Sequence, residues 1–243
     1  MGETRIVRLR LGAAQAYALR GGHGTVLVDA GSSGAQLLLE LGRARIGLPD
    51  LTLLLITHAH TDHFGGAGAL LEAASGLRAA MGRADAAALA AKAGANVDLT
   101  PIGAKGALAA AFVLAATGAG RGDPPKPGSV FVPGIQLDGG EPLAGYGVDA
   151  EVLAVPGHTH GSMAVVVPDA RDEAGRPLGA VAIVGDLVMG GFVFTGRPVP
   201  PFFGVMDQIR ASLSLLKARN VALLFTGHGG PLDADRVWRR FGV

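Results

Sequence analysis

The stretch THAHTDH at residues 57–63 contains three of the chain's seven histidines and one aspartate. Imidazole nitrogens and carboxylate oxygens are common ligands of zinc and related metal ions. His58 and His60 are two residues apart, so at the end of a strand their side chains can point the same way. Asp62 and His63 follow where the chain can turn into a helix, and can face a neighbouring point. The cluster predicts a metal site, and a polar turn is the alternative.

Three later segments end in residues of the same kinds. His158 and His160 follow VLAVPG, Asp186 follows VAIVG and His228 follows ALLFTG. Taken alone, Asp186 could be a turn residue and His228 a structural histidine. Together with the cluster at 57–63, four apolar segments each deliver an imidazole or a carboxylate at their carboxyl ends. Open α/β sheets bind ligands at that edge, so the pattern favours one shared metal pocket.

The number of candidate ligands points to two metal ions. The candidates are His58, His60, Asp62, His63, His158, Asp186 and His228. They can provide three protein ligands for each ion, with Asp186 left to bridge and a water left to react. Two such ions would lie about 3.5–4 Å apart. The chain has no cysteine, so any metal must be held by nitrogen and oxygen atoms.

The elements that must position these residues alternate in the first third of the chain. TVLVDAG at 25–31 and LTLLLITH at 51–58 are short apolar runs that predict buried strands. The segment 32–47 between them predicts a helix with a serine N-cap. We expect a helix at 63–76 that begins inside the histidine cluster, then a strand at 77–81 and a helix at 83–94.

The second half is expected to contain more strands than helices. Residues 96–130 are rich in proline and glycine and predict an insertion with no clear place in the alternation. Its apolar part, 106–120, is shorter than the roughly 20 residues of a membrane span. We expect that part to line the substrate cleft or to form a homodimer contact. Beyond it, strands are expected at 148–157, 162–169, 180–189 and 221–230, and helices at 200–220 and 233–242.

Length and charge limit the function classes. The 243 residues predict a single domain, 1–243, with the insertion at 96–130. A net charge of +1 without runs of like charge gives no basic surface for nucleic acid, so we expect a small-molecule substrate. The N-terminal sequence MGETRIVRLRLG has no apolar segment of signal-peptide length, and we expect a cytoplasmic protein without a membrane span.

The motifs resemble those of the metallo-β-lactamase superfamily. HAHTDH matches its His-x-His-x-Asp-His signature, and PGHT at His158, GD at Asp186 and GH at His228 follow in the family's order. Asp29 in VLVDAG matches an acidic residue at the end of an early strand of that family. The resemblance covers residues 25–231. It implies an α/β fold, the four-layer αβ/βα sandwich, with two mixed sheets face to face, helices outside and the site at one edge.

The resemblance also implies roles for individual residues. One zinc would be held by His58, His60 and His158. The other would be held by Asp62, His63 and His228, with Asp186 bridging. A hydroxide between the metals would attack a carbonyl, and Asp62 would act as the catalytic residue that hydrogen-bonds it. Asp29 would accept a hydrogen bond from the far nitrogen of a ligand imidazole; the alternative is that it caps the helix at 32–47.

The function that this resemblance implies is a dinuclear zinc hydrolase of small ester-like substrates, such as thioesters, lactones or other acyl compounds. The seven-residue set resembles the glyoxalase II-like and lactonase-like branches. A β-lactamase is one alternative. Another is a non-heme iron enzyme that uses oxygen, because the same ligands bind iron or manganese. A non-catalytic metal-binding protein is the third, against which the intact Asp62 argues. His160 stands where the family usually has proline, as a polar group at the pocket rim or a solvated turn residue.

Overall fold

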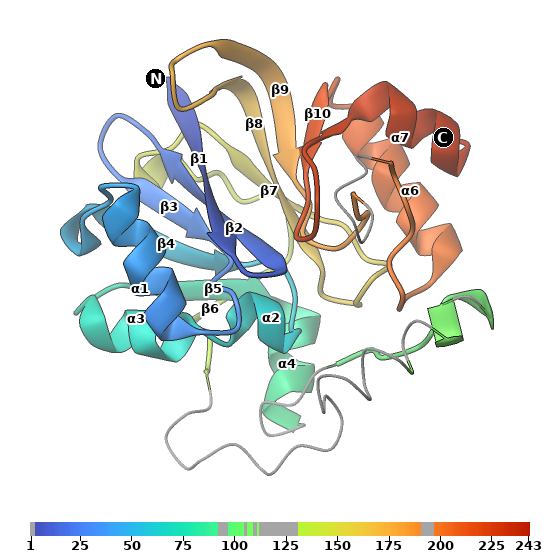
Figure 1. Ribbon diagram of the computed structural model, residues 1–243, viewed down its shortest axis with the longest axis horizontal. Coiled ribbons are helices and arrows are strands. Elements are labelled where there is room, and N and C mark those ends of the chain that lie inside the picture. The colour runs from blue at the N-terminus through green and yellow to red at the C-terminus, as the bar shows by residue number, and fades with distance from the viewer. Residues whose placement is uncertain (1–2, 92–96, 105, 109–110, 112–130, 191–196) are drawn as a thin grey trace.

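The computed structural model describes residues 3–91, 97–104, 106–108, 111, 131–190 and 197–243 (Figure 1). The strands are β1 (Thr4–Leu11), β2 (Ala14–Arg20), β3 (Thr25–Val28), β4 (Leu51–Ile56), β5 (Ala79–Gly82), β6 (Ile135–Leu137), β7 (Glu151–Ala154), β8 (Met163–Arg171), β9 (Pro177–Ile183), β10 (Leu223–Phe225) and β11 (Leu232–Asp233). The α-helices are α1 (Gly34–Arg43), α2 (Thr61–Phe64), α3 (Ala67–Ala73), α4 (Arg83–Ala91), α6 (Met206–Lys217) and α7 (Ala234–Phe241), and short 3-10 helices lie at Leu48–Asp50 and Ala144–Tyr146.

The strands of the described residues form one hydrogen-bonded sheet in the order β11-β10-β9-β8-β1-β2-β3-β4-β5-β6, with β7 paired to β8. In the N-terminal half, β1–β3 are antiparallel neighbours and β3–β6 are parallel ones. In the C-terminal half, β8 is antiparallel to β7 and β9. The two expected sheets are therefore joined along one edge, where β1 and β8 pair in parallel at Thr4 and Arg5.

Three hydrophobic clusters separate four layers, as the fold class predicted. One cluster packs α1 and α3 against the N-terminal half of the sheet. A second lies between the two halves of the sheet, and a third lies under α6 and α7. In β4, Leu54 belongs to the first cluster and its neighbour Leu55 to the second, because successive strand residues face opposite sides. Figure 1 shows α1 and α3 on one outer side and α6 and α7 on the opposite side.

Two helices begin where the sequence predicted, because a polar side chain caps each. Ser33 Oγ accepts a hydrogen bond from Gln36 N at the start of α1, at 3.4 Å. Asp233 Oδ1 accepts one from Arg236 N at the start of α7, at 2.9 Å. Such caps satisfy backbone N–H groups that the first helical turn leaves without partners. Ser33, and not Asp29, therefore caps α1, so that alternative for Asp29 is wrong.

The expected helix at 63–76 is in fact two helices, α2 and α3, separated at Gly65 and Gly66. A Cβ at Gly66 would lie 2.3 Å from Ala30 O, and one at Gly65 would lie 3.0 Å from Ser32 O. The backbone after β3 thus passes directly over the glycine pair, and a residue with a side chain would not fit there. This close approach places α2 against the end of β3.

The N-terminal hairpin of β1 and β2 is absent from our prediction. TRIVRLRL does alternate buried and more exposed residues over part of its length, as a half-buried strand does. The expected insertion at 96–130 stays a prediction, because residues 112–130 lie outside the described residues. Its first residues run beside the segment before α6, where Ile102 N donates to Phe202 O at 2.8 Å and Gly204 N donates to Thr100 O at 2.8 Å. No helix in the described part of the chain is long and apolar enough to cross a membrane.

We predict that Leu55→Ala destabilises the protein by about 2–5 kcal/mol, because truncation leaves a cavity between the two halves of the sheet. Leu55 is fully buried. Leu39 on α1 is 53% exposed, and Leu39→Ala serves as the control that should change the free energy of unfolding little. Urea denaturation followed by circular dichroism measures both. Equal destabilisation by the two variants would contradict the four-layer packing.

Candidate metal centre

The structure brings all seven predicted metal-binding residues together at one edge of the sheet. His58 and His60 follow β4, and Asp62 and His63 lie in α2. His158, Asp186 and His228 follow β7, β9 and β10. The side chains form three overlapping groups in which the ligand atoms lie within 4.8 Å of one another: His58, His60 and His158; His58, His63 and Asp186; Asp62, His63 and His228.

Glycines let these side chains approach one another. A Cβ at Gly227 would lie 2.3 Å from Asp186 Oδ1 and 2.4 Å from His63 Cε1. Gly185 has a φ of +51°, and a Cβ there would lie 2.5 Å from Thr57 Oγ1. Only glycine fits at such close contacts. The glycines beside the ligand-type residues are thus required by the site.

In the first group, one ring nitrogen of His60 and one of His158 face each other without a hydrogen between them. His60 Nε2 lies 2.7 Å from Val97 O, and His158 Nδ1 lies 3.0 Å from Phe203 O. A carbonyl oxygen only accepts, so both of these nitrogens must carry the ring proton. The opposite nitrogens, His60 Nδ1 and His158 Nε2, are then lone pairs in the neutral rings. They face each other at 3.0 Å.

A proton does not resolve this contact at neutral pH. Burial, together with the charge of His60, lowers the pKa of His158 to about 4. Burial also lowers the pKa of His60, and it lowers that of His58 well below the usual value. His58 Nδ1 lies 3.0 Å from Thr57 Oγ1, and its Nε2 is buried without a hydrogen bond. Neutral lone pairs that converge without donors are what a bound cation requires.

The third group, Asp62, His63 and His228, lies beside the carboxylate of Asp186. His63 Nδ1 donates to Asp29 Oδ2 at 2.7 Å, and its Nε2 is buried without a hydrogen bond. Asp186 Oδ1, 3.5 Å from that Nε2, also lacks a hydrogen bond. His228 Nδ1 donates to Ala13 O at 2.9 Å. Its Nε2 therefore faces Asp62 Oδ2 at 3.0 Å and Asp186 Oδ2 at 3.3 Å.

The carboxylates of Asp62 and Asp186 favour positive charge around them. Burial lowers the pKa of His228, but the nearby Asp186 and Asp62 outweigh burial and raise it to about 10. Burial raises the pKa of Asp186, yet the charges of His228 and His63 hold it well below its usual value. For Asp62, burial is likewise outweighed by His63 and His228, and its pKa is lowered. Without a metal, protonated imidazoles supply the positive charge that a metal ion would otherwise provide.

Asp29 makes the kind of hydrogen bond that was expected of it. It is buried, has a φ of +65°, and accepts from His63 Nδ1 through Oδ2. Its oxygens also accept from Thr57 N at 2.7 Å and Thr57 Oγ1 at 2.9 Å. Asp29 thus links the end of β3 to the backbone just before His58 and fixes the orientation of the His63 ring.

Sequence reasoning missed the hairpin that supports His228. The turn between β1 and β2 supplies Ala13 O to the His228 ring, and Gln15 N donates to Gly227 O at 2.9 Å. Gln15 Nε2 donates to Gly229 O at 2.6 Å. The Tyr17 hydroxyl lies 2.7 Å from Thr226 O and 2.9 Å from Gln15 Oε1. The glutamine and tyrosine carry no motif, and only the fold places them beside the loop at 226–230.

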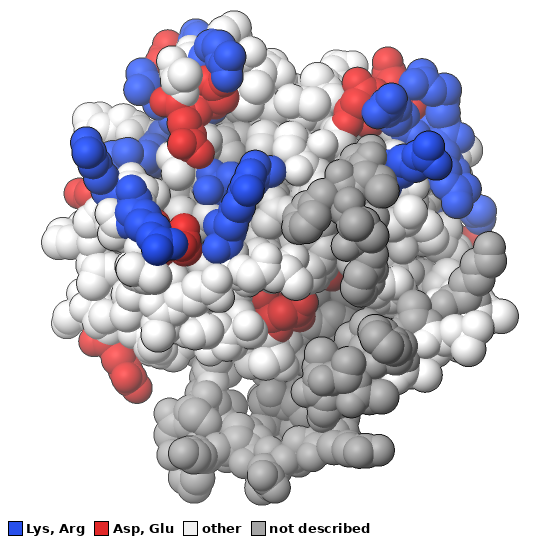
Figure 2. Space-filling view, in the orientation of Figure 1, with Lys and Arg blue, Asp and Glu red and all other residues white. Residues whose placement is uncertain are grey.

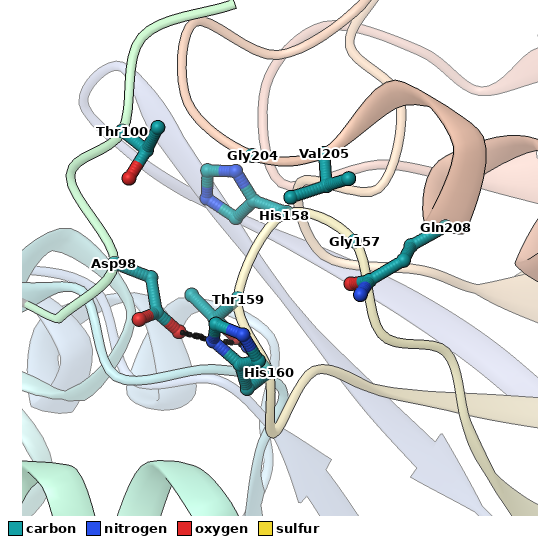
Figure 3. Close-up of a pocket in the computed structure, with 9 residues that line it drawn as sticks. All are labelled: Asp98, Thr100, Gly157, His158, Thr159, His160, Gly204, Val205 and Gln208. Carbon is teal, nitrogen blue, oxygen red and sulfur yellow. Dashed lines mark hydrogen bonds and ion pairs between the residues drawn. The ribbon is translucent and has the colours of Figure 1, made fainter.

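His160 lies on the rim of the site. Its side chain is 68% exposed, and its Nδ1 lies 2.9 Å from Asp98 Oδ2, which also accepts from the His160 backbone N–H at 2.8 Å. Figure 3 shows this pair at a small cavity that Thr100, Gln208 and His158 also line. His160 is an exposed turn residue that also lines this cavity, so both expectations describe its position.

We predict that Tyr17→Phe destabilises the protein by about 1–3 kcal/mol, because it removes the one O–H donor that lies between the buried oxygens of Thr226 and Gln15. Burial raises the pKa of Tyr17 well above its usual value, so the hydroxyl stays protonated and donates. Tyr146, the chain's other tyrosine, is only half-buried, and Tyr146→Phe is the matched control. Chemical denaturation measures both. An unchanged free energy of unfolding in Tyr17→Phe would refute the proposed support of the 226–230 loop.

Solved structures of similar fold are metallo-β-lactamases. One comes from Cronobacter sakazakii and carries a HARLDQ motif; it is 22% identical, with a TM-score of 0.61 over 92% of this chain and 74% of that one. Another is the class B3 di-zinc enzyme LRA-12 from an Alaskan soil metagenome, 17% identical, with a TM-score of 0.60 over 94% of this chain and 77% of that one. A third is a B3 enzyme with an active-site glutamic acid, 20% identical, with a TM-score of 0.63 over 96% and 83%. These likenesses show the fold.

The family is shown by the sequence itself. The profile of the metallo-beta-lactamase superfamily matches residues 9–228, which include all seven ligand-type residues and Asp29. A search of curated proteins finds no match. The recognition made from the motifs is confirmed, and with it the expectation of a metal-dependent hydrolase. The chain belongs to the metallo-beta-lactamase superfamily.

Proposed function

We propose that this protein is a dinuclear zinc hydrolase that cleaves a small ester-like substrate: a thioester, a lactone or another acyl compound. The observation that supports it most is the convergence of lone pairs that no donor satisfies. Lone pairs of His60 and His158 face each other at 3.0 Å, and His58 Nε2 is buried without a hydrogen bond. Zinc binds nitrogen and oxygen ligands of this kind without needing a thiolate.

The proposed ligand sets follow the two outer groups. His58, His60 and His158 would hold one zinc ion, and Asp62, His63 and His228 the other. Asp186 suits a bridging role because its oxygens reach both sets. Its Oδ2 lies 3.3 Å from His228 Nε2 and 3.9 Å from His158 Nε2, and its Oδ1 lies 3.5 Å from His63 Nε2. Iron or manganese would fit the same donors, and the metal content of purified protein decides between them.

A zinc pair would supply a water of pKa about 7 and polarisation of the substrate carbonyl. The chain itself supplies orientation and proton handling. Asp62 is the proposed catalytic residue: its side chain is 45% exposed, whereas those of His63 and Asp186 beside it are buried. Its carboxylate therefore reaches the open side of the site, where it can accept a hydrogen bond from the attacking water and hold it toward the substrate.

The surroundings favour an uncharged acyl substrate. On the face in Figure 2, Lys and Arg side chains gather toward the ends of β1, β8 and β9 and near α7. The surface around α2 is largely uncharged, with acidic atoms at its centre. Phe203 places its ring 6.2 Å from the His60 ring and gives the site one apolar wall. A polyanionic substrate would find few basic side chains to attract it in the surface around α2.

We expect zinc-loaded protein to hydrolyse at least one class among acyl-homoserine lactones, aryl esters and acyl thioesters. A β-lactam in the same panel tests the β-lactamase alternative. Metal analysis before the assay should find two zinc ions per chain. Two bound metals without turnover of any acyl compound would contradict the hydrolase proposal, and iron in place of zinc would favour the oxygen-using alternative.

We predict that Asp62→Ala lowers kcat by about 100-fold or more, because it removes the group that orients the attacking water. Asp207→Ala is the control, since that side chain is 92% exposed on α6. Steady-state kinetics on the best substrate of the panel measures both variants. Equal kcat in Asp62→Ala and the control would exclude Asp62 from catalysis.

Zinc binding should release protons at pH 8. A ligand nitrogen must be unprotonated, and His228, with a pKa of about 10, carries a proton at pH 8 when no metal is bound. His158, with a pKa of about 4, does not. Calorimetric titration in two buffers of different ionisation enthalpy should show about one proton fewer for His228→Ala than for wild type. For His158→Ala the release should stay at the wild-type level, and equal losses in both variants would contradict the assigned protonation states.

A further inference from the structure

Asp85 is a buried carboxylate that the proposed reaction does not use. It lies in the first turn of α4 and is 0% exposed. Its Oδ2 accepts hydrogen bonds from Ala59 N at 2.7 Å and from Thr159 Oγ1 at 2.8 Å. Its Oδ1 accepts one from Gly161 N at 2.7 Å. A buried carboxylate is costly unless it is hydrogen-bonded, and here three donors compensate it.

The three donors belong to the two loops that carry the first group of histidines. Ala59 lies between His58 and His60, and Thr159 directly follows His158. The first loop comes from β4 in the N-terminal half of the sheet, and the second from β7 in the C-terminal half. One carboxylate thus binds both loops that carry His58, His60 and His158, on the side away from the converging ring nitrogens.

The loop after His158 lies so close to Asp85 that only glycine fits at the point of contact. A Cβ at Gly161 would lie 2.3 Å from Asp85 N and 2.6 Å from Asp85 Oδ1. A Cβ at Gly82, at the end of β5, would lie 2.1 Å from Gly161 O. The loop after His158 therefore rests directly on the start of α4. Any change at Asp85 must act on the position of this loop.

We infer that Asp85 is a positioning residue that fixes the distance between the His58–His60 loop and the His158 loop, and so sets the metal affinity of that group of three histidines. The inference rests on the proposed metal function and adds a residue that none of the family motifs contains. Residues that support metal ligands from behind typically change metal affinity 10- to 100-fold when they are replaced.

The test is a titration of metal-free protein with Co²⁺, followed by visible absorption. Wild type should bind two equivalents. Asp85→Asn keeps the shape of the side chain but replaces one accepting oxygen with an amide N–H₂ group. At least one of the three donors then faces another donor. One equivalent should then bind about 10-fold or more weakly, while the other keeps its wild-type affinity. Asp138→Asn, an exposed carboxylate paired with Arg83, is the control that should bind as wild type does.

A second variant guards against loss of the fold. Thr159→Val removes only the hydroxyl that joins the His158 loop to Asp85 and preserves the side-chain volume. Thr4→Val is its match, because Thr4 is equally buried and its hydroxyl accepts one hydrogen bond, from Asp149 N, far from the site. Both variants should lose some unfolding free energy, measured without metal. Only Thr159→Val should weaken one cobalt equivalent.

The outcomes separate the two proposals. Two cobalt equivalents in wild type, with one selectively weakened in Asp85→Asn and Thr159→Val, support the role of Asp85. Unchanged cobalt affinities in both variants would overturn it and leave the hydrolase proposal standing. Equal weakening of both equivalents would also overturn it, since that marks a general structural role. A wild-type protein that binds no cobalt would overturn the metal function and the role of Asp85 together.

Discussion

Four imidazoles of the site each bond a fixed oxygen through the outward ring nitrogen. These bonds decide which nitrogen carries the proton, and the chemistry of the site depends on that placement. Each of four oxygens accepts a hydrogen bond from one ring nitrogen. The pairs are Val97 O with His60, Phe203 O with His158, Asp29 with His63, and Ala13 O with His228. The inward nitrogens of His60 and His158 are then lone pairs that meet each other. Those of His63 and His228 face carboxylates, which hold protons on them when no metal is bound. Such a centre is electrostatically incomplete as pure protein. Its demand for positive charge is what makes it a metal centre.

The partners that fix these protons come from parts of the chain far from the histidines. Val97 lies at the start of the expected insertion, Phe203 precedes α6, Asp29 follows β3 and Ala13 lies in the turn between β1 and β2. The hydrogen bond from His228 to Ala13 O joins the two halves of the sheet, so it forms only when they are docked. The cluster between the halves therefore does more than stabilise the fold, because it sets the distance between ligands supplied by each half.

The two proposed ligand sets differ in charge, and this difference affects how each would bind a metal. The first contains three imidazoles whose pKa values burial lowers, so it is neutral without metal. The other set, Asp62, His63 and His228, lies beside Asp186. The carboxylates of Asp62 and Asp186 hold protons on His63 and His228. A metal at the first group adds positive charge to a neutral pocket. A metal at the set of Asp62, His63 and His228 replaces protons already there, so its affinity for metal should depend more strongly on pH.

The sequence alone determined the chemistry and most of the fold. The spacing in THAHTDH and the ligand-type residues at the ends of three later apolar strands predicted seven candidate metal ligands, and the structure brings these side chains together. The buried strands β3 and β4 and the caps of α1 and α7 follow from local patterns, because apolar runs and capping residues act over a few positions. The hydrogen bond of Asp29 to a ligand imidazole was reached through the family resemblance.

Only the tertiary structure decided what surrounds and orients those donors. The hairpin of β1 and β2, the pairing of β1 with β8, and the support that Gln15, Tyr17 and Asp85 give to the ligand loops depend on contacts between residues tens to hundreds of positions apart. A buried glutamine or aspartate looks the same in sequence as an exposed one. Its role appears only when the fold encloses it and leaves distant backbone N–H and C=O groups as its available partners.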